Sequence, residues 1–262
     1  MSSLLFFIIG AVVGSFLNVC IYRLPRGESI VFPPSHCPNC GAQLKPYDLV
    51  PILSYLFLLG RCRRCREKIS WRYPLVEFLS GCAFALAWQA ALGRPLYFAF
   101  YALFLACLIV VFFIDLEFQV IPDAVSVLGI AGGLIFSLLQ GAVSLKIIDF
   151  DPLISSLGGM LLGFSLLYAI GFLGRSYYKK EVIGEGDLYL AALLGVFLGW
   201  AGVLLAIFLG YVLAALASGA LLLSGRIKFS GYIPFGPALA AGGAIALFYG
   251  TPIINWYLGN FL

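Results

Sequence analysis

Residues 184–223 read "GEGDLYLAALLGVFLGWAGVLLAIFLGYVLAALASGALLL", and this stretch decides the fold. A helix that crosses a membrane needs about 20 apolar residues, so the stretch is long enough for two crossings. The segment Gly199–Gly202 is the one place in it that marks a turn. With a turn there the chain has eight spans, and without one it has seven.

The composition of the whole chain is typical of a polytopic membrane protein. Of its 262 residues, 62% are hydrophobic and 11% are charged, and the mean hydropathy is +1.04. Soluble domains have about 45–50% apolar and about 25% charged residues. The first apolar run, residues 3–22, lacks a basic start and a small-residue cleavage site, which favours a span over a cleaved signal peptide. We therefore predict an all-α polytopic membrane protein.

Charge decides between seven and eight spans. The eight predicted spans lie near residues 3–22, 74–92, 95–114, 123–141, 153–173, 187–200, 201–224 and 234–258. Lys and Arg concentrate in cytoplasmic loops. Eight spans place 14 of the 16 basic residues on one side and leave only Arg94 and Lys146 on the other. Merging the two spans within 187–224 would move Arg226 and Lys228 to the wrong side. We therefore favour eight spans with both termini extracytoplasmic.

This topology brings two aspartates to the same membrane face. Asp115 ends one span in "FFIDLEFQVIPD", and Asp187 begins another in "GEGD". Two neighbouring carboxyl groups can act as an aspartic-protease dyad, in which one ionised group activates a water and its protonated neighbour polarises the scissile carbonyl. Like charges a few ångströms apart cannot both ionise, so the pair would share a proton.

Other interpretations of these acids remain open. An Asp at a helix start is often an N-cap, and both Asp187 and Asp123 fit that role. Asp115 sits at a helix C-terminus, where the helix dipole disfavours an anion, so something must hold it there. Paired intramembrane acids also serve transporters and proton-coupled channels, although such sites usually lie near the midplane. A non-catalytic assembly scaffold would leave both Asp115 and Asp187 replaceable.

Three further residues are candidates for positioning a substrate. Gly184 and Gly186 permit positive φ and a close backbone approach, which would admit an extended peptide beside Asp187. Glu77, in "RYPLVEFLSG", lies just inside a predicted span. It could orient a substrate amine or pair with Arg72, or it could be an interfacial acid that reaches toward water.

The segment 25–73 contains two Cys-x-x-Cys pairs. These four residues are Cys37, Cys40, Cys62 and Cys65. Paired spacings of this kind are typical of a tetrahedral Cys₄ Zn²⁺ site. Two disulfides are the alternative, but the charge pattern places this segment in the cytoplasm, where thiols stay reduced. About 50 residues cannot bury a large core, so we expect the metal to be structural. The adjacent His36 is expected to be a bystander.

Together these motifs resemble the type 4 prepilin peptidases, the bacterial leader peptidases of type IV pili and type II secretion. The motifs "GSFLNVCIYRLP", the Cys₄ segment, "RYPLVE", "FIDLEFQVIPD", "GEGD" and "IPFGPALA" occur in the family's order from about residue 10 to residue 241. The resemblance implies that Asp115 and Asp187 are catalytic. It also implies cleavage of prepilin and pseudopilin leaders after Gly at the cytoplasmic face of the inner membrane, and N-methylation of the new terminus by S-adenosylmethionine.

The resemblance also implies a domain organisation and partners. We predict a first transmembrane helix over 1–24, a cytoplasmic zinc-binding domain over 25–73 and a peptidase domain over 74–262. Segment 25–73 has eight basic and three acidic residues, which suits anionic lipid headgroups and not a basic leader. The acids Glu117, Glu181 and Glu185 are better suited to the leader. We expect no nucleic-acid partner.

Two further features of the sequence bear on the match to the family. Ile121 replaces the Leu that family members often carry before Pro122, a conservative change. No Gly-rich strand–helix loop for S-adenosylmethionine is visible. The methyltransferase activity therefore depends on the resemblance, because the Cys₄ segment accompanies the bifunctional members of the family.

Overall fold

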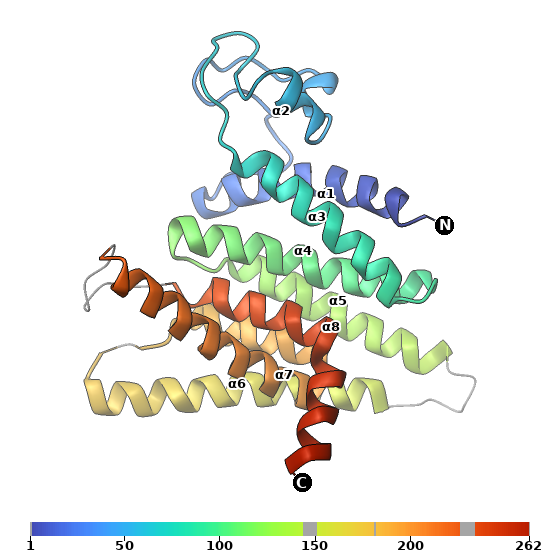
Figure 1. Cartoon of the computed structure of the whole chain (residues 1–262), viewed down its shortest axis with the longest axis vertical. Helices are drawn as coiled ribbons and strands as arrows, with labels where there is room; N and C mark the ends of the chain where they lie inside the picture. The colour runs from blue at the N-terminus through green and yellow to red at the C-terminus, as the bar shows by residue number, and fades with distance from the viewer. Residues whose placement is uncertain (1, 144–150, 181, 226–233, 262) are drawn as a thin grey trace. The chain divides into compact units, whose positions relative to one another are not determined.

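The computed structural model describes residues 2–143, 151–180, 182–225 and 234–261, and its regular elements there are helices (Figure 1). The all-α prediction is confirmed. The chain forms two compact units, Met1–Val110 and Val111–Leu262. Four residues invoked above, Lys146, Glu181, Arg226 and Lys228, lie outside the described residues.

The first unit contains two long helices that pack closely. These are α1 (Ser3–Arg23) and α3 (Arg72–Ala90), and α4 (Pro95–Phe118) also begins in this unit. A Cβ at Gly14 would lie 2.8 Å from the Glu77 Cα, and one at Gly10 would clash with the Ser80 carbonyl oxygen. Small residues therefore let the α1 and α3 backbones approach, as is common between membrane helices.

In the sequence, residues 24–71 of the first unit connect α1 to α3. It holds the short elements η1 (Leu24–Arg26), η2 (Pro46–Leu49) and α2 (Leu53–Phe57). The four cysteines of the Cys-x-x-Cys pairs belong to this part of the chain.

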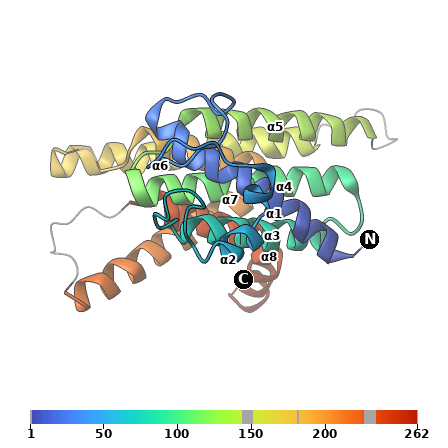
Figure 2. The same ribbon diagram turned by 90° about the horizontal axis from the view of Figure 1, so that it is seen from above.

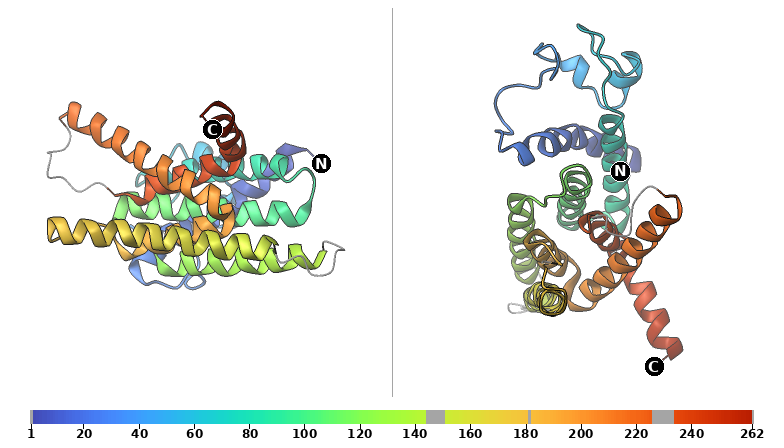
Figure 3. Two further views of the ribbon diagram at one scale, coloured as in Figure 1. Left: turned by 90° about the horizontal axis from the view of Figure 1, so that it is seen from below. Right: turned by 90° about the vertical axis from the view of Figure 1, so that its left-hand side faces the viewer.

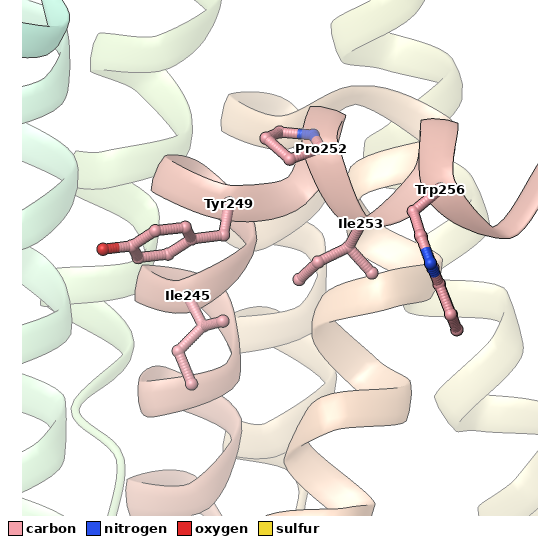
Figure 4. A pocket seen from close by; sticks show the side chains of 5 residues that line it. All are labelled: Ile245, Tyr249, Pro252, Ile253 and Trp256. Carbon is pink, nitrogen blue, oxygen red and sulfur yellow. The ribbon is translucent and has the colours of Figure 1, made fainter.

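The second unit contains the end of α4 and four further helices. These are α5 (Asp123–Val143), α6 (Asp151–Tyr178), α7 (Glu185–Leu223) and α8 (Gly236–Phe261). α5 and α6 lie side by side (Figure 2), and the hydroxyl oxygens of Ser137 and Ser156 are hydrogen-bonded at 2.7 Å. α8 bends near Pro252, which removes a backbone donor, and a shallow apolar hollow lined by Tyr249 and Trp256 lies at the bend (Figure 4).

The helix α7 is a hairpin of two helical segments. Gly199 has φ 67° and ψ −176° inside it. A Cβ at Gly163 of α6 would lie 2.5 Å from the Ala191 carbonyl oxygen and 2.9 Å from the Val203 Cγ2. In a straight helix those two residues would be about 18 Å apart. The chain therefore reverses at Gly199, and the predicted turn is confirmed. The course of α7 can be followed in Figures 1 and 3.

Six helices in the described ranges are long and apolar enough to cross a membrane, with α7 counted once. Gly199 divides α7 into two arms, and a separate crossing by each arm stays a prediction. α3 has 19 residues and is not among the six, so its crossing stays a prediction that its packing along α1 supports.

Replacing Gly199 with Ala is expected to destabilise the hairpin. Its backbone conformation is essentially restricted to glycine and costs other residues about 1–3 kcal/mol. A Cβ there would also lie 2.7 Å from the Ser155 Oγ. Thermal unfolding in detergent should show a lower midpoint for Gly199→Ala. The control Gly219→Ala, where no described atom lies within 4 Å of the new Cβ, should unfold like the unmodified protein. Equal midpoints for both variants would contradict the hairpin turn.

Candidate active site and metal centre

Asp115 is buried near the end of α4 and is held by the start of α8. Its side chain is 4% exposed, and its Oδ2 accepts a hydrogen bond of 2.9 Å from the backbone N–H of Gly236. Gly236 is the first residue of α8, and helix N-termini attract anions. The N-terminus of α8 thus supplies the compensation that an acid at the C-terminus of α4 requires.

Asp187 is buried in the first turn of α7 and stabilises the start of that helix. Its Oδ2 accepts a hydrogen bond of 3.2 Å from the Gly184 N–H, and its own N–H donates to the Gly184 carbonyl at 3.1 Å. Gly184 is the N-cap residue of α7 and has no side chain, so the Asp187 carboxylate stabilises the helix start from the third helical position. Asp187 is therefore not the N-cap residue itself, although its carboxylate accepts a bond from the N–H of that residue. This bond does not exclude a chemical role, because only Oδ2 of Asp187 accepts a bond from the described residues.

The structure brings the two aspartates together. Asp115 and Asp187 lie 72 residues apart in the sequence and interact electrostatically in the second unit. Both side chains are more than nine-tenths buried. At short range in such a site two negative charges are strongly unfavourable. A proton shared between the two carboxyl groups stays a prediction.

Ile121 packs between the two helix starts that hold these acids. A Cβ at Gly186 would lie 2.7 Å from the Ile121 Cβ, and a Cβ at Gly236 would lie 3.1 Å from the Ile121 Cδ1. Ile121 thus fills the space that both glycines leave open. A Cβ at Gly184 would be 3.4 Å from the Asp187 Oδ2, an ordinary contact. Substrate positioning by Gly184 and Gly186 stays a prediction.

Three residues of this site were missed in the sequence: Gly236, Ile121 and Tyr211. Tyr211 interacts electrostatically with Asp187, and its ring centroid lies 4.8 Å from that of Phe235. Asp187 and Tyr211 are each twelve residues from Gly199, so a hairpin turning at Gly199 places them at the same level. That equal spacing is a sequence signal that could have identified Tyr211.

Glu77 lies in the first unit, on α3. Its side chain is 7% exposed, and its Oε2 accepts a hydrogen bond of 2.7 Å from the Ile52 N–H. Its backbone packs against α1, where a Cβ at Gly14 would lie 2.8 Å from the Glu77 Cα. Ile52 has φ 62°, and the Leu53 N–H donates to the Pro51 carbonyl at 2.6 Å, which is the geometry of a strained γ-turn. Glu77 therefore holds the chain just before α2, and its role with a substrate stays a prediction.

The four cysteines form one cluster of free thiols. Their Sγ atoms all lie within 4.8 Å of one another, and Cys37 Sγ and Cys65 Sγ are 3.8 Å apart. Tetrahedral Zn²⁺ with bonds of about 2.3 Å separates its sulfur ligands by about 3.8 Å, so the cluster fits a metal ion. His36 is not part of it and contacts the Pro34 carbonyl through Nδ1 at 3.0 Å.

The two Cys-x-x-Cys pairs lie in matching backbone knuckles. The Cys37 carbonyl accepts a bond from the Gly41 N–H, and the Cys62 carbonyl accepts one from the Arg66 N–H. Gly41 and Arg66 both have positive φ. Burial raises the pKa of the Cys37 thiol to about 11, whereas the backbone N–H groups of Cys65 and Arg64 lower the pKa of Cys62 to about 6. Bringing all four to the thiolate form requires a cation.

Comparison with known proteins covers nearly the whole chain. Family models for the bacterial peptidase A24 N-terminal domain and the type IV leader peptidase family match residues 8–91 and 102–219. A "Prepilin leader peptidase/N-methyltransferase" of Aeromonas hydrophila is 37% identical over 98% of this chain and 94% of that protein. Proteins with the same name from Bacillus subtilis (strain 168) and Pseudomonas putida are 35% and 34% identical, over 96% and 94% of this chain and 96% and 90% of their own. No solved structure matches significantly.

Proposed function

Because the chain belongs to the type IV leader peptidase family, we propose that it is a membrane-embedded aspartic endopeptidase that removes prepilin leaders and then N-methylates the new N-terminus. The observation that carries the peptidase half is the buried, interacting pair Asp115 and Asp187. Each carboxyl group is fixed by a backbone N–H, from Gly236 and Gly184 respectively, so both are positioned before any substrate arrives.

The proposed reaction uses a water between the two carboxyl groups. The ionised group takes a proton from the water, whose oxygen attacks the carbonyl carbon of the scissile peptide bond, while the protonated group donates to the carbonyl oxygen. The tetrahedral intermediate then collapses as a proton passes to the leaving nitrogen. The C–N bond breaks, and the products are a leader carboxylate and a free amine on the pilin.

Charge near the aspartates suits a basic leader. Glu117 and Glu185 are exposed and lie two residues from Asp115 and Asp187 in the sequence. A prepilin helix would enter laterally between the spans, with its leader at the cytoplasmic face of the bacterial inner membrane. The acids would attract that leader, and the glycines at 184 and 186 would leave its backbone room.

We propose that the Cys₄ cluster holds a structural Zn²⁺ and that the methyl donor is S-adenosylmethionine. The sulfur spacing supports the metal. For the donor, the neighbourhood of Glu77 and Asn18 is the best candidate, because the Asn18 Oδ1 is buried without a hydrogen-bond partner in the described structure. The donor's amino groups could supply that bond. We retain the division into a first transmembrane helix (1–24), a cytoplasmic zinc domain (25–73) and a peptidase domain (74–262).

The proposed activity can be tested with purified protein in detergent. A prepilin whose leader ends in Gly should be cut once after that Gly, and label from methyl-labelled S-adenosylmethionine should then appear on the new N-terminus. A prepilin with that Gly replaced by Val is the control and should stay intact. Absence of cleavage by folded protein would refute the peptidase assignment, and cleavage without label would refute the methyltransferase assignment alone.

Replacing Gly236 with Ala should lower cleavage without unfolding the protein. The new Cβ would lie 2.5 Å from the Asp115 Oδ2, so the carboxyl group must move. Misplacement of a catalytic group by about 1 Å can cost about 100-fold in rate, and we expect a loss of about that size in kcat. Gly158→Ala is the control, because its Cβ would meet no described atom within 4 Å. Full activity of folded Gly236→Ala would contradict the proposed position of Asp115.

A further inference from the structure

Six large apolar side chains are exposed around α2 in the Cys₄ segment. They are Leu49, Val50, Leu53, Leu56, Phe57 and Leu59, and we call them the apolar ridge. Phe57 is 83% exposed and Leu59 is 85% exposed. Large apolar side chains this exposed within one short segment suit a protein or membrane contact.

Basic side chains flank the ridge on both sides in the sequence. They are Lys45, Arg61, Arg63, Arg64, Arg66 and Lys68, all of them exposed. The nearest acid, Asp48, is already paired with Arg63 at 2.8 Å. Segment 25–73 has eight basic and three acidic residues, and even a Zn²⁺ with four thiolates would leave it positive. The partner of the ridge must therefore be apolar and negatively charged.

The hydrogen bond from Ile52 to Glu77 places the turn before α2 beside the middle of α1. Ile52, which precedes Leu53 of the ridge, donates to the Glu77 carboxylate. The Glu77 backbone packs on Gly14 of α1. Gly14 is nine residues before Arg23, the last residue of α1, which corresponds to about 13 Å along the helix. If α1 spans the membrane, the turn before α2 lies below the level at which α1 ends.

We propose that the apolar ridge is inserted into the membrane beside α1 and α3, and that the surrounding basic side chains bind anionic lipid headgroups. Apolar side chains at the headgroup boundary with Lys and Arg around them are the pattern of an interfacial anchor. A basic leader peptide is the less suitable occupant, because its charge has the same sign. The anchor holds the Cys₄ segment against the membrane surface and involves no catalytic residue.

Photo-crosslinking of the full-length protein in lipid nanodiscs tests this inference independently of the peptidase or methyltransferase activity. Phe57→p-benzoylphenylalanine should give a phospholipid adduct on irradiation, identified by mass. The control carries the same probe at Gln43, which is exposed but outside the ridge, and should give several-fold less adduct. The proposal would be overturned if the probe at position 57 formed no lipid adduct on irradiation. A crosslink from this probe to the protein itself or to added prepilin would also overturn it. Zinc content measured on each variant confirms that the segment is folded.

Changing the lipid composition tests whether the basic side chains bind anionic headgroups. In nanodiscs with one-third phosphatidylglycerol, the adduct at position 57 should exceed that in pure phosphatidylcholine by about threefold or more. Arg64→Glu combined with Lys68→Glu should abolish that difference. If the protein with its basic residues unchanged gave equal adduct yields in both lipids, anionic headgroups would not be the partner of these residues.

Discussion

Asp115→Asn and Asp187→Asn should each abolish prepilin cleavage, with a fall in kcat of at least about 1,000-fold. Asn has nearly the shape of Asp and can still accept the backbone bonds that Gly236 and Gly184 donate. It cannot take a proton from water or give one to the scissile carbonyl, and loss of acid–base catalysis costs about 10²–10⁴-fold for each positioned group. Initial cleavage rates of a synthetic prepilin, at matched amounts of folded enzyme, measure the effect.

The matched control for these variants is Asp123→Asn. Asp123 is an exposed acid at the first residue of α5, after Pro122 as the N-cap, so Asn there costs only the small interaction of the charge with the helix dipole. It should cleave at nearly the unmodified rate and unfold at the same temperature. Normal cleavage by either Asp115→Asn or Asp187→Asn would remove the basis for a dyad and favour a transporter or scaffold.

Loss of the metal should unfold the Cys₄ segment and leave the second unit folded. Structural Zn²⁺ contributes about 10–16 kcal/mol of apparent binding free energy to small metal domains, far more than a segment of this size gains from its core. We expect the unmodified protein, purified under reducing conditions, to hold one zinc per chain. Cys62→Ser should hold almost none, and limited proteolysis should then cut within residues 25–73.

Cys82→Ser is the control for the metal, since Cys82 is a free thiol of α3 outside the cluster. It should keep a full complement of zinc and the unmodified protease resistance. A reducing preparation without zinc, or a Cys62→Ser variant that keeps its zinc, would contradict the Cys₄ site.

The sequence was most informative where a local signal was strong. Gly199–Gly202 in an apolar run, together with the distribution of basic residues, predicted the reversal within α7 that the structure contains. The spacing of the cysteines predicted their clustering. The same charge argument predicts Asp115 and Asp187 at one membrane face, and in the structure Ile121 packs against both Gly186, next to Asp187, and Gly236, which holds Asp115.

The contacts that fix this arrangement could not be predicted in the same way. Asp115 is held by Gly236, which is 121 residues away, and neither residue carries a local sign of the other. In the sequence Ile121 is only a conservative change within a motif, yet it packs against both Gly186 and Gly236. The position of Asp187 fits a cap or a catalyst, whereas the bond to the Gly184 N–H uses only one of its two oxygens. Contacts across such distances depend on side-chain packing, which no residue pattern in a single sequence records.

A comparison of the double variant Asp115→Asn/Asp187→Asn with the two single variants tests the central claim most directly. Groups that act as one catalytic unit are strongly non-additive, because removing either one already removes the shared chemistry. If the two aspartates share one water and one proton, the double variant should cleave prepilin as slowly as each single variant, within about threefold. If the two losses instead multiply, the aspartates act independently and the dyad is wrong.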